Sequence, residues 1–155
     1  MKSKIPSNFI VALVVLFGCA PANAADDSLD WLTKAAEQGD ANAQSTLGEA
    51  YAFGEGVPQD DTEAVKWYRK AAEQGEATAQ NNLGVMYAEG RGVPKDDAMA
   101  YAWLNLAAAS GDERARNNRG IIEKEMTPSQ IEKGQSLARE IFDRIQKRKE
   151  AAEAE

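Results

Sequence analysis

The residues of this chain that could do chemistry are mainly carboxylates arranged in pairs. Asp60-Asp61 and Asp96-Asp97 stand 36 residues apart. Carboxylate oxygens are ligands for hard cations such as Ca²⁺ and Mg²⁺, so a metal site is one interpretation. The first Asp of each pair, however, stands where a helix is expected to begin, and a carboxylate there caps free backbone N–H groups. The second lies in the first turn, where the helix dipole favours negative charge. We interpret both pairs as structural and predict no metal site.

The composition excludes most other catalytic chemistry. The chain has no histidine, and Cys19 is its single cysteine. Ser-His and Cys-His catalysis and histidine-based metal sites are therefore excluded, and no intrachain disulfide can form. The Gly-x-Gly turns at 54–56 and 90–92 follow predicted helices, and no Gly-Lys-Ser/Thr follows them, so they are not phosphate loops. We predict no catalytic residue, no cofactor and no enzyme activity.

The formal net charge of −7 bears on the choice of partner. An acidic chain without basic stripes argues against binding to nucleic acid or to anionic membranes, because their phosphates need Lys and Arg for neutralisation. We interpret the charge as a contribution to solubility and expect a protein or peptide partner.

Residues 1–24 have the features of a cleaved signal peptide. A basic start precedes an uncharged apolar run over 9–20, which is short for a transmembrane helix, and the small-x-small pattern Ala22-Asn23-Ala24 follows. Cleavage after Ala24 predicts an exported protein, periplasmic or secreted, with no membrane insertion afterwards. The alternative is a lipoprotein, because Leu16-Phe17-Gly18-Cys19 resembles a lipobox in which Cys19 carries the lipid anchor. Phe17 departs from the small or β-branched residue usual in that motif.

The elements that position all these residues follow a 36-residue period. Trp31, Trp67 and Trp103 keep this step, and the segment 35–58 has a near copy at 71–94. A fixed period of about 20–50 residues is typical of stacked repeats. Apolar residues at three- and four-residue steps predict helices that end at glycines. The chain is therefore a helical repeat protein, and we expect the tryptophans to lie in its core.

The period divides the chain into units. We predict a repeat array over 25–126, composed of a half repeat at 28–39, repeats at about 40–75 and 76–111, and a degenerate repeat at 112–126. Thr127, Pro128 and Gln130 have the pattern of a capping box with proline at the first helical position. They open a capping helix and tail over 127–155, because a terminal unit must stop the stacking.

Glycine also recurs inside the first helix of each unit, as Gly48, Gly84 and Gly120. Glycine in a helix interior costs about 1 kcal/mol relative to alanine. We therefore predict that a partner helix comes too close for a Cβ atom at each of these positions.

Three motifs over about 28–126 resemble those of Sel1-like repeats, which are relatives of tetratricopeptide repeats. They are Leu-Gly-x-x-Tyr, Gly-x-Gly-Val-Pro-x-Asp and Ala-x-x-Trp-x-x-x-Ala-Ala-x-x-Gly. The resemblance implies an all-α fold: an α/α superhelical solenoid of stacked helix-turn-helix repeats with a C-terminal capping helix. It also implies a scaffold or adaptor for protein complexes. A disulfide-rich subgroup is associated with penicillin binding and weak β-lactamase activity, but it depends on a cysteine pair in each repeat, which this chain lacks.

Positions carried over from the tetratricopeptide-like pattern predict a concave binding face made by the first helices. The function we expect is that of a non-catalytic, exported scaffold that binds a protein or peptide on this face. An ordinary solvated face, a cell-wall or β-lactam-active enzyme, and a self-associating structural module are the alternatives. The predicted face consists of Asn42, Ser45, Glu49, Phe53, Thr78, Asn81, Val85, Glu89, Arg114, Asn117 and Ile121.

Overall fold

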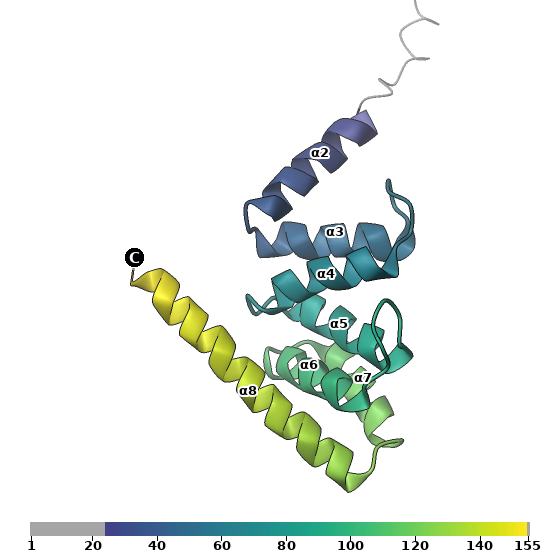
Figure 1. Ribbon diagram of the computed structural model, residues 1–155, viewed down its shortest axis with the longest axis vertical. Coiled ribbons are helices and arrows are strands. Elements are labelled where there is room, and N and C mark those ends of the chain that lie inside the picture. Colours follow the sequence, from purple (N-terminus) through teal and green to yellow (C-terminus); the bar gives the residue numbers. More distant parts are fainter. Residues whose placement is uncertain (1–23, 155) are drawn as a thin grey trace, which may run out of the picture.

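The structure, a computed structural model, describes residues 24–154, and in that part of the chain every regular element is a helix (Figure 1). This confirms the predicted all-α repeat solenoid. The predicted signal peptide, apart from Ala24, and Cys19 lie outside the described residues. The helices are α2 (Ala24–Glu37), α3 (Ala41–Phe53), α4 (Asp61–Ala72), α5 (Ala77–Glu89), α6 (Asp97–Ala109), α7 (Glu113–Glu123) and α8 (Pro128–Glu153).

The helix ends are specified by local chemistry. Asp40 begins α3, and its carboxylate accepts a hydrogen bond from the Ala43 N–H at 2.8 Å. Gly54 ends α3 with φ of +72° and Gly90 ends α5 with φ of +69°, left-handed values that favour glycine. The predicted capping box also forms, since the Thr127 N–H donates to Gln130 Oε1 at 2.8 Å. Helix α2 begins at Ala24, four residues before the predicted half repeat at 28–39.

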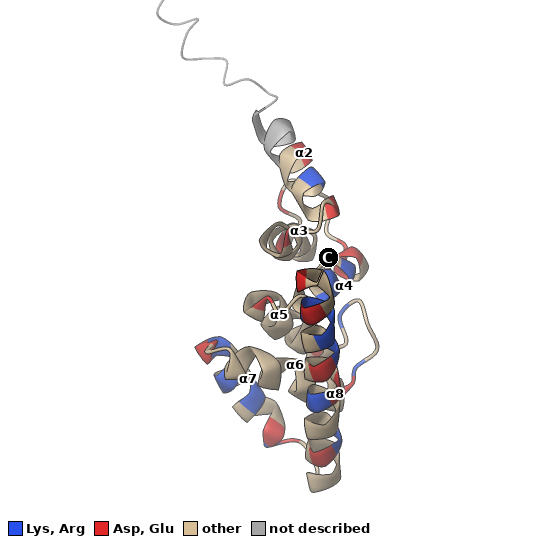
Figure 2. Cartoon of the chain, turned by 90° about the vertical axis from the view of Figure 1, so that its left-hand side faces the viewer, with Lys and Arg blue, Asp and Glu red and all other residues tan. Residues whose placement is uncertain are grey.

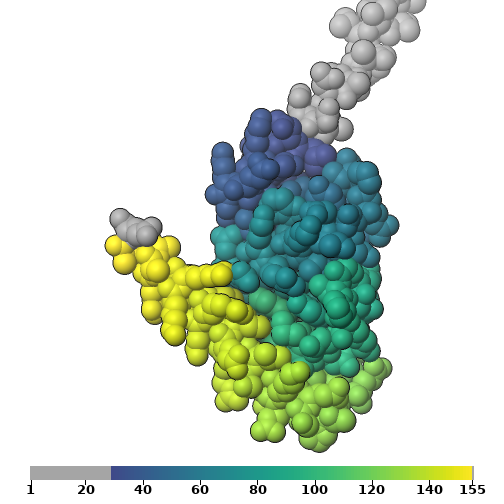
Figure 3. All heavy atoms as spheres, viewed as in Figure 1, coloured from purple at the N-terminus to yellow at the C-terminus, as the bar shows by residue number. Residues whose placement is uncertain are grey.

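The helices form two layers with α8 across their ends. The first helices of successive units, α3, α5 and α7, follow one another on one side of the molecule, and α4 and α6 lie on the other (Figures 1 and 2). Helix α8 packs mainly on α6 and reaches the α4–α5 loop, where Arg148 Nη1 lies 2.7 Å from Glu73 Oε2. Its last turns stand away from the stack (Figure 3).

The core is continuous from the first repeat, at 40–75, into the capping helix. Ala71, Ala72 and Leu83 are fully buried there and belong to the same apolar cluster as Ile141 and Ile145 of α8. The small alanines let the helices approach closely, and Ile141 and Ile145 add to the larger side chains that fill the remaining space. The capping helix is thus part of the main core rather than an addition to its edge.

The helix-interior glycines fall into two groups. A Cβ atom on Gly48 would lie 2.7 Å from Cδ1 of Tyr68, and one on Gly84 would lie 2.7 Å from Cγ of Leu104. The predicted close approach is therefore confirmed at these two positions. At Gly120 it is wrong, because a Cβ there would meet nothing within 4 Å. The helix that follows in this unit is α8, and it packs on α6 instead of closing on this part of α7.

The three tryptophans also differ. Trp103 is buried in the main core, and Trp67 is half-buried, with Lys70 Nζ 3.9 Å from its ring centroid. Trp31 is 69% exposed, so the expectation of a core position is wrong for this residue. Trp67 packs against a cluster that includes Ala36 of the preceding unit. Trp31 lies in the outermost described helix, where no preceding described helix covers it.

Candidate functional site

The eleven predicted binding residues lie on α3, α5 and α7, and we call the surface of these three helices the first-helix face. Its members differ in accessibility. Exposed residues are Asn42, Phe53, Glu89, Arg114, Asn117 and Ile121; half-buried residues are Glu49, Thr78 and Val85; buried residues are Ser45 and Asn81.

The two buried members of the set face the interior. Ser45 and Asn81 are 6% and 5% exposed. Asn81 accepts a hydrogen bond from Asn118 Nδ2 at 3.0 Å and donates to Asn82 Oδ1 at 3.2 Å. Asn82 in turn donates to Glu49 Oε1 at 3.3 Å. This chain of amide and carboxylate contacts links α3, α5 and α7, so the network aligns the helices that make the face.

Large apolar side chains stand exposed on the same face. Phe53 is 67% exposed and Ile121 is 59% exposed, and these are two of the four large apolar residues that the described part of the chain exposes. Val85, the repeat counterpart of Ile121, is half-buried on the helix between them. Contiguous apolar exposure marks interaction surfaces, and Phe53 and Val85 line one pocket on this face.

A small pocket of about 60 Å³ opens beside Phe53 and Val85 and brings in residues that the sequence did not indicate. Tyr68, Asn82 and Arg91 line it as well. Burial raises the pKa of Tyr68 well above its usual range, with a smaller contribution from Glu49, so its hydroxyl stays protonated at neutral pH. The pocket therefore offers an apolar wall with neutral and cationic hydrogen-bond donors at its polar end.

Arg91 is held in place by the neighbouring repeat. Its Nη2 donates to Asp61 Oδ1 at 2.6 Å and its Nε to Asp61 Oδ2 at 3.2 Å, and Nη2 also reaches the Ala52 carbonyl at 3.4 Å. The hydrogen bond that Arg91 donates to Asp61 raises the pKa of Arg91 above its usual value. A comparison of the two repeat copies could have indicated this contact, because the first Gly-x-Gly turn has Glu55 where the second has Arg91.

The carboxylate pairs serve the helix starts. Asp60 accepts hydrogen bonds from the N–H groups of Thr62 and Glu63 at 2.9 and 3.0 Å, and Asp96 accepts one from Met99 at 3.0 Å. Asp61 pairs with Arg91. Over residues 24–154, no group of three or more Asp, Glu, His or Cys side chains is placed to hold a metal ion.

Comparison with known proteins fits this geometry. The Sel1 repeat family model matches residues 16–40, 41–76 and 77–112. A similar solved structure is c5321, a protective antigen of uropathogenic Escherichia coli described as displaying an SLR fold, with 34% identity over 86% of this chain and a TM-score of 0.76. A Sel1 repeat protein from Oxalobacter formigenes shares 49% identity over 58% of this chain, with a TM-score of 0.57.

This chain spans 28% and 26% of those two proteins, so it corresponds to about a quarter of their length. The search of curated proteins found no match. Within the described part of the chain, none of the helices combines the length and the apolar character needed to cross a membrane.

Proposed function

This chain belongs to the Sel1 repeat family, and we propose that it is an exported, non-catalytic scaffold that binds a protein or peptide on its first-helix face. Sel1 repeats are commonly protein-interaction modules. The observation that carries the proposal is the exposure of Phe53 and Ile121 on the helices where the repeat pattern places a binding surface.

The chemistry of the face suits a peptide with apolar anchors. Binding energy concentrates in a few side chains that fill pockets and are surrounded by polar contacts. Phe53 and Val85 provide an apolar pocket wall, and Asn82 stands beside it with an amide that can bond a peptide backbone. Glu89 of α5 is exposed, and its Oε2 lies 3.7 Å from Nη1 of Arg91, which lines the pocket. A basic residue in the partner could therefore pair with this carboxylate.

Site-specific crosslinking tests the proposal. A photoreactive amino acid at Phe53 or Ile121, in cells that express the full chain, should capture the same protein from both positions. Lys66 on α4 is the control position, because it is exposed but lies outside the first-helix face. Equal capture from all three positions, or none from Phe53 and Ile121, would contradict the assignment.

With the photoreactive amino acid moved to the exposed Asn117, the double variant Phe53→Ala with Ile121→Ala should reduce capture at least tenfold. The thermal midpoint should stay nearly unchanged, because both side chains are exposed. The buried Asn81 is unsuitable for this purpose, since its loss would disturb the helix alignment itself. Nitrocefin turnover by the purified chain would contradict the non-catalytic part of the proposal.

Export is a separate part of the proposal, supported by the basic start, the apolar run and the small-x-small pattern of residues 1–24. We expect the processed chain to begin at Ala25 in the periplasmic or secreted fraction. N-terminal sequencing of protein purified from cells decides this. A first residue at Cys19 carrying lipid would instead support the lipoprotein alternative.

The exposed surface of α2 favours self-association as a second candidate function. Trp31 is 69% exposed and, with Leu29 and Leu32, lines a surface hollow of about 460 Å³ at the outer end of the stack. A mass that rises with concentration, and that Trp31→Gln returns to the monomer value, would support this candidate. A constant monomer mass would exclude it.

A further inference from the structure

The second repeat contains a buried hydrogen-bond acceptor that has no partner among the described residues. Gln44 and Gln80 occupy the same repeat position, and each Nε2 donates to a carbonyl at the end of the preceding helix, Ala36 O at 2.9 Å and Ala72 O at 3.1 Å. Gln80 is only 3% exposed, and within residues 24–154 its Oε1 has no hydrogen-bond partner. Buried polar atoms are nearly always paired, so this oxygen calls for an explanation.

The first repeat shows what normally fills this place. There, Gln74 Nε2 donates to Gln44 Oε1 at 2.7 Å. The residue 36 positions after Gln74 is Ser110, whose side chain is too short to do the same. Its hydroxyl donates instead to the Leu106 carbonyl at 3.2 Å. The replacement of glutamine by serine therefore removes a donor and several atoms of side-chain volume at one point.

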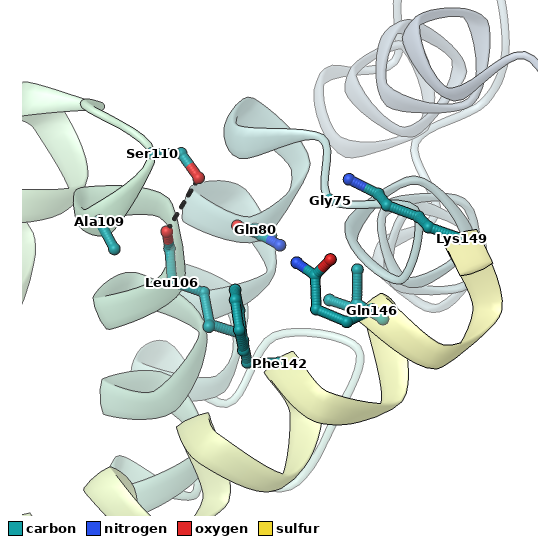
Figure 4. A pocket seen from close by; sticks show the side chains of 9 residues that line it. Gly75, Gln80, Leu106, Ala109, Ser110, Phe142, Gln146 and Lys149 are labelled. Carbon is teal, nitrogen blue, oxygen red and sulfur yellow. Dashed lines mark hydrogen bonds between the residues drawn. The ribbon is translucent and has the colours of Figure 1, made fainter.

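A pocket of about 150 Å³ lies at this point, between the α4–α5 loop, the end of α6 and α8 (Figure 4). Gln80 and Ser110 line it, and Leu106 and Phe142 provide apolar walls. Lys149 of α8 extends over the α4–α5 loop, with its Nζ 3.1 Å from where a Cβ on Gly75 would stand. Gln146 of α8 adds a carboxamide to the lining (Figure 4). The pocket is thus about equally polar and apolar, with the buried Gln80 acceptor in its wall and a cation at its edge.

We propose that this pocket binds the carboxamide side chain of a glutamine supplied by a polypeptide partner. The amide N–H would donate to Gln80 Oε1, as that of Gln74 does to Gln44 in the first repeat. The amide oxygen would accept from Lys149. An ionised carboxylate has no N–H or O–H to give, and an ammonium group would be repelled by Lys149.

The size of the pocket agrees with this occupant. A cavity of about 150 Å³ holds benzene, which has about six heavy atoms, close to the five or so of a glutamine side chain. The pocket is lined by α6, α8, the α4–α5 loop and the buried Gln80 of α5, and it shares no residue with the predicted binding set on the first-helix face. The two sites are therefore tested by different residues, and failure of one leaves the other standing.

The test is an NMR titration of the full chain with N-acetyl-glutamine methylamide. N-acetyl-glutamate methylamide is the matched probe, and we expect it to bind about tenfold more weakly or less, because it leaves the buried acceptor unpaired. Intermolecular contacts between the probe amide protons and the Phe142 ring would confirm the position. Equal affinity for both probes, or no binding, would overturn the proposal and leave an ordered water as the partner of Gln80.

A variant pair provides the control. Ser110→Gln restores the donor of the first repeat, so it should fill the pocket, raise the thermal midpoint and abolish probe binding. Ser110→Ala leaves the pocket open and should bind as the unmodified chain does. If Ser110→Gln retains binding, the pocket is not the site. If propionamide binds as tightly as the glutamine probe, the site is one for small free amides and the polypeptide partner is wrong.

Discussion

Two glycines at equivalent positions of the repeat face opposite surroundings. Gly84 would place a Cβ 2.7 Å from Leu104 Cγ and 3.2 Å from the Ala100 carbonyl, whereas Gly120 would place one in open space. Ala100 O is backbone and cannot move aside without shifting α6. The same substitution should therefore have opposite effects at the two positions.

We predict that Gly84→Ala destabilises the fold by about 1–3 kcal/mol through overpacking. Gly120→Ala should stabilise it by up to about 1 kcal/mol, because alanine is the better helix former and meets no neighbour. Urea unfolding followed by circular dichroism measures both values in one series. Similar changes of the same sign at the two positions would contradict the packing difference.

Asp112 makes the stability depend on pH. Burial opposes ionisation of its carboxyl, but hydrogen bonds from the Ala115 N–H and from Arg114 outweigh burial and lower its pKa. A lowered folded-state pKa stabilises the fold at pH values above the unfolded value of about 3.9, and this contribution is lost as the pH falls through the folded value.

We therefore predict that Asp112→Asn reduces the free energy of unfolding at pH 7 and flattens its decline between about pH 5 and pH 2. Asparagine keeps a side-chain oxygen for the cap at the start of α7 and loses only the charge. The measurement is thermal unfolding at a series of pH values. An unchanged pH profile in the variant would show that Asp112 does not couple folding to protonation.

At the scale of helices, the sequence was a reliable guide where neighbours along the chain decide the structure. The caps at Asp60 and Asp96 and the box at Thr127 depend on residues within one turn. Trp31 and Gly120 were mispredicted because their surroundings depend on which helix stacks there. Periodicity says that a residue faces a neighbour but not whether a neighbour is present.

The same distinction between local pattern and stacking applies to the candidate site. The repeat pattern placed Phe53 and Ile121 on one face, and their exposure agrees with a surface position. It did not indicate that Asn81 is buried or that Arg91 reaches Asp61 in the preceding unit. These contacts join residues about 30 or more positions apart, and they follow from how the repeats stack. Ser110 stands where the preceding repeat has Gln74, and this difference opens the pocket between α6 and α8. It is visible only when the copies are compared residue by residue.

Helix α8 buries one face in the core and exposes the other. Ile141 is 2% exposed within the main core, while its neighbour Phe142 is 49% exposed. Ile141→Ala should cost about 2–5 kcal/mol through lost burial and cavity formation. Phe142→Ala should cost much less, although it removes more atoms. Chemical denaturation of the two variants decides the matter, and a larger loss for Phe142→Ala would show that α8 packs with a different face.

For the whole molecule, stacking implies that stability depends on how many neighbours a helix has. In solenoids each unit contacts only adjacent units, so free energy is distributed along the stack. Helix α6 packs against α5, α7 and α8, whereas within residues 24–154 α2 packs mainly against α3. The interior of the array is therefore held from three sides and its outer end from one.

We predict a gradient of amide hydrogen exchange along the chain at neutral pH. Amides of α6 should exchange only through global unfolding, and those of α2 should exchange fastest of the helices, because local opening of a terminal element breaks few contacts. Hydrogen exchange is measured by NMR or mass spectrometry, first in the unmodified chain and then in the variant Ile141→Ala. That variant should lower protection in α6 and α5 together, since Ile141 shares their core cluster, while α2 changes little. Uniform protection from α2 to α8 would mean that the short array unfolds as one cooperative unit.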